Sequence, residues 1–196
     1  MKKSWIIIIV IIVVVFMTGS WFIGKYNTMV VANETVNEKW AQVENVYQRR
    51  ADLIPNLVAT VKGYATHEKE TLQGVVEARA KATSTTIDAG NMDAAQLQKF
   101  QAAQQGLSSA LSRLMVVVEK YPDLKANQNF IELQSQLEGT ENRIAVERKR
   151  FNEAAKAYNL SIRVFPNSML AGMYGFEKKA YFKAEEASKT APKVEF

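Results

Sequence analysis

The sequence lacks cysteine altogether and has a single histidine, His67, among its 196 residues. The absence of cysteine excludes disulfides, thiolate metal sites and cysteine nucleophiles. His67 opens the sequence His-Glu-Lys-Glu, but a zinc-protease helix needs a second histidine four positions later, where Thr71 stands. We therefore interpret His67 as a helix-end or surface residue and expect no metal site.

Motifs of enzyme chemistry are missing as well. The sequence has no Gly-x-Ser-x-Gly, no glycine-rich phosphate loop and no aspartate cluster with calcium-loop spacing. The acidic residues between positions 127 and 165 alternate with arginines, which is typical of a solvated helix face. These acidic residues are Glu132, Glu138, Glu141, Glu147 and Glu153. We predict that the protein is not an enzyme and binds no cofactor.

The positive charge of the chain is concentrated near its beginning. The formal net charge is +5, of which Lys2, Lys3 and Lys25 supply three, and no acid lies before Glu34. Residues 26–196 are therefore left with only +2, a mixed-charge surface without a basic patch for nucleic acid. We expect no nucleic-acid partner.

An uncharged run of 19 residues, Trp5 to Ile23, follows a short tail at residues 1–4. As a helix this run spans about 28 Å, close to the hydrocarbon thickness of a bilayer. A cleaved signal peptide is the alternative, but its apolar region covers only about 7 to 15 residues and small residues follow it. Here the aromatic pair Trp21-Phe22 stands in that place. We predict a retained transmembrane anchor over residues 5–23, with the lipid bilayer as a partner.

The charges that flank this anchor predict its orientation. Lys2 and Lys3 precede it, whereas Lys25 is the nearest charge after it. The positive-inside rule therefore favours a cytoplasmic N-terminus and places the rest of the chain on the extracytoplasmic side of the membrane.

From Tyr26 to Tyr64, apolar residues recur at alternating steps of three and four, with Asn33 and Arg50 in the two gaps. This seven-residue repeat is typical of a long helix that packs lengthwise on partner helices. Pro55 lies inside the run, yet the phase of the repeat is the same on both sides of it. We therefore predict one helix that is kinked at Pro55 and continues beyond it.

Three more helical segments follow. They are predicted at residues 69–87, from an N-cap at Asp93 to Val118, and from about Asn127 to Phe165, with a break at Pro122. No strand pattern is present outside the anchor. The predicted fold is all-α, an anchor followed by an elongated antiparallel up-down four-helix bundle over residues 26–165, in which the first and fourth helices are long.

The inward phase of Arg50 predicts a polar contact inside the bundle. In an antiparallel alignment of the two long helices, position 50 lies opposite residues 138–142, so Glu141 is the expected partner and Glu138 the alternative. A buried arginine needs such a partner, and we expect the pair to fix the register of the helices. The same alignment places Asn33 near Tyr158 as a second polar pair.

Residues 166–196 form the predicted C-terminal segment, a short helix followed by a tail. The stretch 168–182 is rich in methionine and aromatics, including Met169, Met173, Tyr174 and Phe176. Two interpretations stay open: a short helix packed on the bundle, or a surface that contacts the membrane or a second copy. The last residues, 189–196, are expected to be extended or disordered.

Two long stretches are similar to the LemA family of bacterial membrane-anchored helical proteins. They are RRADLIPNLVATVKGYATHE at residues 49–68 and LEGTENRIAVERKRFNEAAKAYN at residues 137–159, with IRVFP and GF after them. The resemblance covers nearly the whole chain and implies a helical bundle on an N-terminal anchor, with the two stretches facing one another. Glu147 stands where the family pattern leads us to expect a small residue, and the family offers no catalytic residue to transfer.

Together these observations predict a non-enzymatic scaffold or organiser of the bacterial envelope, anchored once in the cytoplasmic membrane. Self-assembly into a homo-oligomer suits long helices with an anchor at one end. The alternative is an adaptor or accessory subunit that binds a membrane protein partner such as a protease or a transporter.

Overall fold

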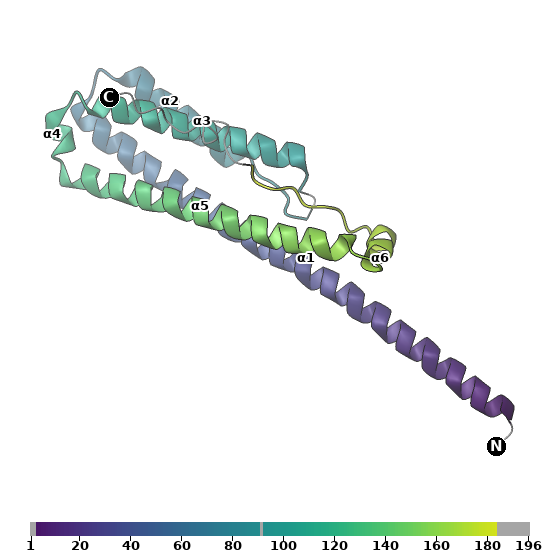
Figure 1. Ribbon diagram of the computed structural model, residues 1–196. Coiled ribbons are helices and arrows are strands. Elements are labelled where there is room, and N and C mark those ends of the chain that lie inside the picture. The colour runs from purple at the N-terminus through teal and green to yellow at the C-terminus, as the bar shows by residue number, and fades with distance from the viewer. Residues whose placement is uncertain (1–2, 91, 184–196) are drawn as a thin grey trace, which may run out of the picture.

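In the computed structural model, residues 3–90 and 92–183 are described, and within them the regular secondary structure is entirely helical. Figure 1 shows an elongated molecule with α5 lying along α1, and α2 beside α3. The helices are α1 (Lys3–Tyr64), α2 (Lys69–Ser84), α3 (Ala94–Val118), α4 (Pro122–Lys125), α5 (Gln128–Arg163) and α6 (Asn167–Tyr174).

The predicted anchor and the first predicted helix are one continuous helix. α1 has 62 residues, and its purple end projects alone from the rest of the molecule in Figure 1. Residues 3–24 are exposed, Met29 is the first buried residue, and from Val36 onward the helix buries a side chain at steps of three or four residues, with Ala51 in addition. α1 is also the one helix among the described residues that is long and apolar enough to cross a membrane.

α1 continues through Pro55, and α2 supplies the hydrogen bond that this proline removes. Proline has no N–H, so the carbonyl four residues earlier, that of Ala51, has no donor within the helix. Ala51 is buried, and the Arg79 Nε of α2 donates to its carbonyl oxygen at 2.7 Å. Arg79 thus satisfies a buried acceptor that would otherwise cost free energy.

The helices pack in the spatial order α5, α1, α2, α3, each in close contact with the next. A closed four-helix bundle would also bring α3 against α5. These two helices make almost no close backbone approach, so the bundle is open on that side. α2 ends at Ser84 rather than at the predicted Ile87 and has 16 residues against 36 for α5. Beyond Ser84 the two long helices lack this neighbour.

Other boundaries follow local capping. The Asp93 side chain accepts a hydrogen bond from the Gln96 N–H at 2.7 Å and so begins α3 where the sequence predicted. Asn127 caps α5 in the same way through the Phe130 N–H. α5 ends at Arg163, two residues before the predicted end.

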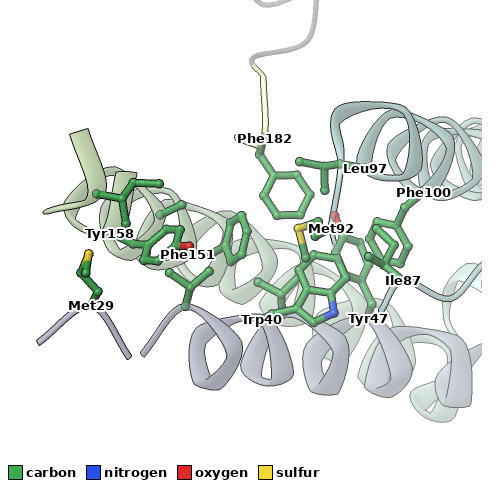
Figure 2. Close-up of a cluster of buried hydrophobic side chains, with 14 of the residues drawn as sticks. Met29, Trp40, Tyr47, Ile87, Met92, Leu97, Phe100, Phe151, Tyr158 and Phe182 are labelled. Carbon is green, nitrogen blue, oxygen red and sulfur yellow. The ribbon is translucent and has the colours of Figure 1, made fainter. Parts of the chain in front are cut away.

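The buried apolar side chains form two clusters along the long axis. The proximal cluster, drawn in Figure 2, lies nearer the projecting end of α1 and the distal cluster lies at the opposite end. The proximal cluster consists of Met29, Val36, Trp40, Val43, Tyr47, Ile87, Met92, Leu97, Phe100, Ile144, Phe151, Ala155, Tyr158, Ile162, Leu170, Ala171 and Phe182. The distal cluster consists of Ile54, Leu57, Val61, Ala65, Leu72, Val75, Ala82, Leu107, Ala110, Leu114, Val118, Leu124 and Phe130.

Candidate functional site

Residues 176–183, which we call the strap, leave α6 and run back along α5 without forming a helix (Figure 1). Two asparagines of α5 bind the backbone of the strap. The Asn159 amide donates to the Lys179 carbonyl oxygen at 2.8 Å and accepts from the Lys179 N–H at 2.9 Å. The Asn152 amide makes the same pair of bonds with Phe182, at 3.0 and 2.9 Å. Each asparagine therefore pairs with one strap residue as a neighbouring β-strand would.

The spacing of these bonds shows that the strap is extended and antiparallel to α5. Asn152 and Asn159 are seven residues apart on a helix, which corresponds to a rise of about 10 Å. Three residues of strap, from 179 to 182, cover the same distance, and a fully extended chain advances about 3.3 to 3.6 Å per residue. Two helical turns of α5 thus match three residues of an extended peptide.

Two side chains of the strap enter the body of the protein. The Phe182 ring is buried, stacks on Trp40 at a centroid distance of 6.0 Å and meets Phe151 edge-on at 5.5 Å (Figure 2). Lys179 is also buried, and its Nζ donates to the carbonyl oxygens of Ala89 and Gly90 at 2.9 and 2.7 Å. The strap is therefore held by a lysine and an aromatic ring three residues apart as well as by its backbone.

The electrostatics of this contact depend on the burial of Lys179. Burial lowers the pKa of the Lys179 ammonium below its ordinary value of 10.5, while Asp88, Glu177 and Glu34 act in the opposite direction. Burial also raises the pKa of the Tyr158 hydroxyl, which donates to the Glu177 carbonyl oxygen at 2.9 Å.

A polar network centred on Arg50 lies between the proximal and distal clusters. The Arg50 side chain is only 3% exposed, and its Nη1 lies 2.8 Å from Glu141 Oε2 and 3.1 Å from Ser108 Oγ. Its Nη2 donates to Gln104 Oε1 at 2.7 Å, and Gln104 in turn donates to the Ala82 carbonyl oxygen at 3.3 Å. One side chain of α1 thus contacts α3 and α5 directly and α2 through Gln104.

An open cavity of about 850 Å³ separates α3 from α5 beside this network. Its lining includes Arg50, several glutamines of α3 and the strap. Arg148, Lys178 and Lys183 add positive charge to the rim, against Asp93 and Glu141. Within the described residues, no group of three or more His, Asp or Glu side chains could hold a metal ion.

The structure places the other predicted polar residues differently. Glu138 is exposed and accepts from Gln134 on its own helix, so it is not the partner of Arg50. The predicted Asn33–Tyr158 pair is wrong: the Tyr158 hydroxyl is bound by the Glu177 carbonyl oxygen, because the strap lies over that part of α5. Glu147 is half-buried and pairs with Arg150 at 2.7 Å, and His67 is exposed.

The predicted interface residues divide into two groups. Met169, Met173 and Tyr174 are 64%, 76% and 57% exposed, whereas Phe176 is half-buried against the proximal cluster. The Tyr174 and Phe176 rings both meet the ring of Tyr26, at centroid distances of 4.8 and 5.7 Å. α6 therefore packs on α1 just after the exposed apolar run while it also presents an apolar face to the outside. The predicted tail at residues 189–196 lies outside the described residues.

Sequence reasoning missed the residues that hold the strap. Asn152 and Asn159 stand in the second family-like stretch, seven residues apart, but a helical repeat says nothing about an extended segment that returns to it. Phe182 and Lys179 stand in a region without periodicity. For Arg79 a signal existed, because Pro55 left a buried carbonyl that needed a donor.

Comparisons with known proteins place the chain in one family. The LemA family profile matches residues 39–196, so the exposed apolar run of α1 precedes the matched range. The chain is 30% identical over 184 residues to the magnetosome protein MamQ 2 of Paramagnetospirillum magneticum, covering 85% of this chain and 67% of that relative.

Two further relatives match over a similar share of the chain. Magnetosome protein MamQ of Magnetospirillum gryphiswaldense is 29% identical over 183 residues, covering 85% of this chain and 67% of the relative. Protein LemA of Metamycoplasma hominis is 21% identical over 165 residues, covering 84% and 72%. The chain therefore belongs to the LemA family.

Proposed function

We propose that this protein is a non-enzymatic scaffold of the bacterial envelope that is anchored once in the cytoplasmic membrane by α1 and assembles laterally with its own kind. Its amino terminus lies in the cytoplasm and its helical domain on the extracytoplasmic side. The observation that carries this proposal is the continuity of α1, in which 22 exposed residues, 3–24, lead directly into the buried core without a linker.

A continuous helix favours a scaffold over a tethered binding domain. A flexible linker would let the domain sample many orientations above the membrane. α1 instead fixes the domain to the membrane segment, because the helix that crosses the bilayer is also the helix that buries Trp40 and Ile54. Copies in one membrane then present the same faces to one another.

The exposed face of α6 is the surface we assign to this lateral contact. Met169 and Met173 of α6 are 64% and 76% exposed, Phe165 just before α6 is 80% exposed, and α6 packs against α1 close to the end of the apolar run. Exposed apolar side chains in a group are typical of an interaction surface. Leu170 and Ala171 on the other face are buried, so α6 is held in place while it presents this surface.

The mass of the full-length protein in mild detergent, measured by light scattering, tests this proposal. We expect a defined homo-oligomer for the natural sequence and a smaller species for Met169→Gln with Met173→Gln. Because both methionines are exposed, this variant retains the fold, and circular dichroism checks that its helix content is unchanged. Monomers at every protein concentration would contradict self-assembly.

The cavity between α3 and α5 supports an adaptor as a second candidate. It is open, and its glutamines and basic side chains offer many hydrogen-bond donors to a protein partner. A monomeric protein that co-purifies with a defined membrane protease or transporter after crosslinking in cells would favour this function.

A further inference from the structure

The strap is bound by Asn152 and Asn159 of α5 and by Gln101 of α3, and we call this surface the groove. Its contacts with the strap do not depend on which copy of the chain carries the strap. Asn152 and Asn159 bind main-chain atoms of the strap, and the chain joins the strap to the groove only through α6. Any copy of residues 176–183 offers the same backbone groups, the same lysine and the same phenylalanine. A peptide that fits the groove is therefore present wherever a second copy is present.

We propose that in the membrane the strap is exchanged, so that residues 176–183 of one copy occupy the groove of a second copy. This exchange rests on the lateral assembly proposed above and supplies its mechanism. Exchange of an identical element preserves every contact of the closed monomer, so its free-energy cost is small and it commonly produces dimers.

The connection between α6 and the strap is suited to such an exchange. Gly175 ends α6 with φ of 72°, and the Phe176 N–H bonds to the Ala171 carbonyl oxygen at 3.0 Å. A Cβ at position 175 would meet no atom within 4 Å, so the backbone conformation rather than lack of space calls for glycine here. Glycine adopts other conformations as readily, and a change at this single residue redirects the strap away from its own groove.

The position of α6 brings a second copy close to this hinge. Met173 and Tyr174, which directly precede Gly175, are 76% and 57% exposed. Anchoring in one plane raises the effective concentration of neighbouring copies, which converts a weak contact into an efficient one. A contact through α6 would hold the strap of each copy next to the groove of the other.

The natural absence of cysteine allows a direct test in full-length protein. Gln101 Nε2 lies 3.3 Å from the Lys183 carbonyl oxygen, so Gln101→Cys and Lys183→Cys place one thiol on the groove and one on the strap. The two single variants carry different tags, are co-expressed, and are treated in their native membranes with a short bifunctional maleimide. Ser109→Cys, which is exposed and two turns further along α3, replaces Gln101→Cys as the matched control for collisions.

We expect a crosslinked heterodimer from Gln101→Cys with Lys183→Cys and none above background from Ser109→Cys with Lys183→Cys. Adding Asn152→Ala and Asn159→Ala removes five hydrogen bonds to the strap, four to its backbone and one to the Tyr181 hydroxyl, and should lower the heterodimer yield at least about tenfold. A chain carrying both cysteines reports the total occupancy of the groove. If that chain crosslinks within itself and the mixed chains give no heterodimer, the exchange is overturned.

Light scattering on the same preparations separates the two proposals. A defined oligomer with crosslinks only within one chain would overturn the exchange and leave the scaffold function standing. A monomer would overturn both.

Discussion

The proximal and distal clusters are built along the same two long helices, yet their composition differs. The distal cluster is aliphatic, with Phe130 as its one aromatic ring, and its residues come from helices and the turn after α1. In the proximal cluster Trp40 meets Phe100, Phe151 and Phe182 at centroid distances of 5.3 to 6.0 Å. Its covering residues also come from the loop after α2, from α6 and from the strap.

The length of α2 explains this difference. In the distal half, α2 packs on α1 and α3 packs on α2, and side chains of all three helices join in one cluster. In the proximal half α2 has ended at Ser84, and the loop residues Ile87 and Met92 and the strap residue Phe182 fill the space. Large aromatic rings fill such a space with few residues, because each buries about 150 to 250 Å². One half of the molecule is thus closed by helices and the other by an extended peptide.

The largest expected effect lies at the boundary between the clusters. Arg50→Glu would bury a carboxylate next to Glu141, and it should destabilise the fold by at least about 3 kcal/mol. We expect unfolding or aggregation, measured as loss of the urea transition and of helical circular dichroism in detergent. Glu141→Gln is the matched control: it keeps a hydrogen-bond acceptor for the Arg50 guanidinium, and the Glu141 side chain is 58% exposed, so it should destabilise the fold less than Arg50→Glu does. A folded, equally stable Arg50→Glu variant would refute the assigned role of Arg50.

The second largest effects are expected from truncating one large side chain in each cluster, and the two truncations should differ in their effect on the strap. Trp40→Ala and Leu57→Ala should cost about 3 to 5 and 2 to 5 kcal/mol respectively. Trp40→Ala should also release the strap, because Phe182 stacks on the indole ring, whereas Leu57→Ala should leave it bound. The rate of maleimide labelling of Lys183→Cys in each background measures this release. Equal labelling in both backgrounds would show that the strap does not depend on the proximal cluster.

A smaller effect is expected within the distal half, where Arg79 compensates for Pro55. Arg79→Ala should leave the buried Ala51 carbonyl without a donor and cost about 1 to 3 kcal/mol. Pro55→Ala restores the backbone N–H, so in that background the cost of Arg79→Ala should fall close to zero. Urea unfolding of the four proteins in a double-mutant cycle measures the coupling. Additive costs would contradict the pairing.

The smallest expected effect is the pH dependence of the stability that Lys179 of the strap contributes. The pKa of Lys179 is lowered in the folded protein relative to 10.5, so between the two values the unfolded chain binds more protons. The contribution of Lys179 to stability should therefore rise as the pH increases towards 10.5. The difference in unfolding free energy between the natural protein and Lys179→Met, followed from pH 8 to 10.5, checks this sign. A difference that shrinks over that range would show that burial does not dominate at Lys179.

Much of the helical architecture is predictable because it is periodic. The seven-residue repeat of α1 gives the inward positions of Trp40, Val43 and Arg50, and an antiparallel alignment with α5 suffices to place Glu141 opposite Arg50. Asp93 is recognised as a cap because it precedes a new apolar run. These features depend on the spacing of residues within each helix and on the antiparallel alignment of the two long helices.

The candidate site is less predictable because it depends on a segment with no period. In the sequence, Asn152 and Asn159 look like ordinary polar residues of a helix. Their role becomes visible only when the extended strap is known to return over α5. The same return explains why Tyr158 is bound by the Glu177 carbonyl oxygen and not by Asn33. The end of α2 before Ile87 created the space for this return.

Because α1 is one continuous helix, the rotation of the helical domain about the axis of α1 is fixed relative to the apolar run at residues 5–23. An α-helix turns about 100° per residue, so a single residue inserted at Gly24 would rotate the whole domain by that angle relative to the face of the membrane segment. Seven inserted residues would restore nearly the original angle at a height increased by about 10 Å. In the lateral assembly proposed above, the faces that neighbouring copies present to one another are therefore set by the number of residues between Ile23, the last residue of the apolar run, and Met29, the first buried residue of the core.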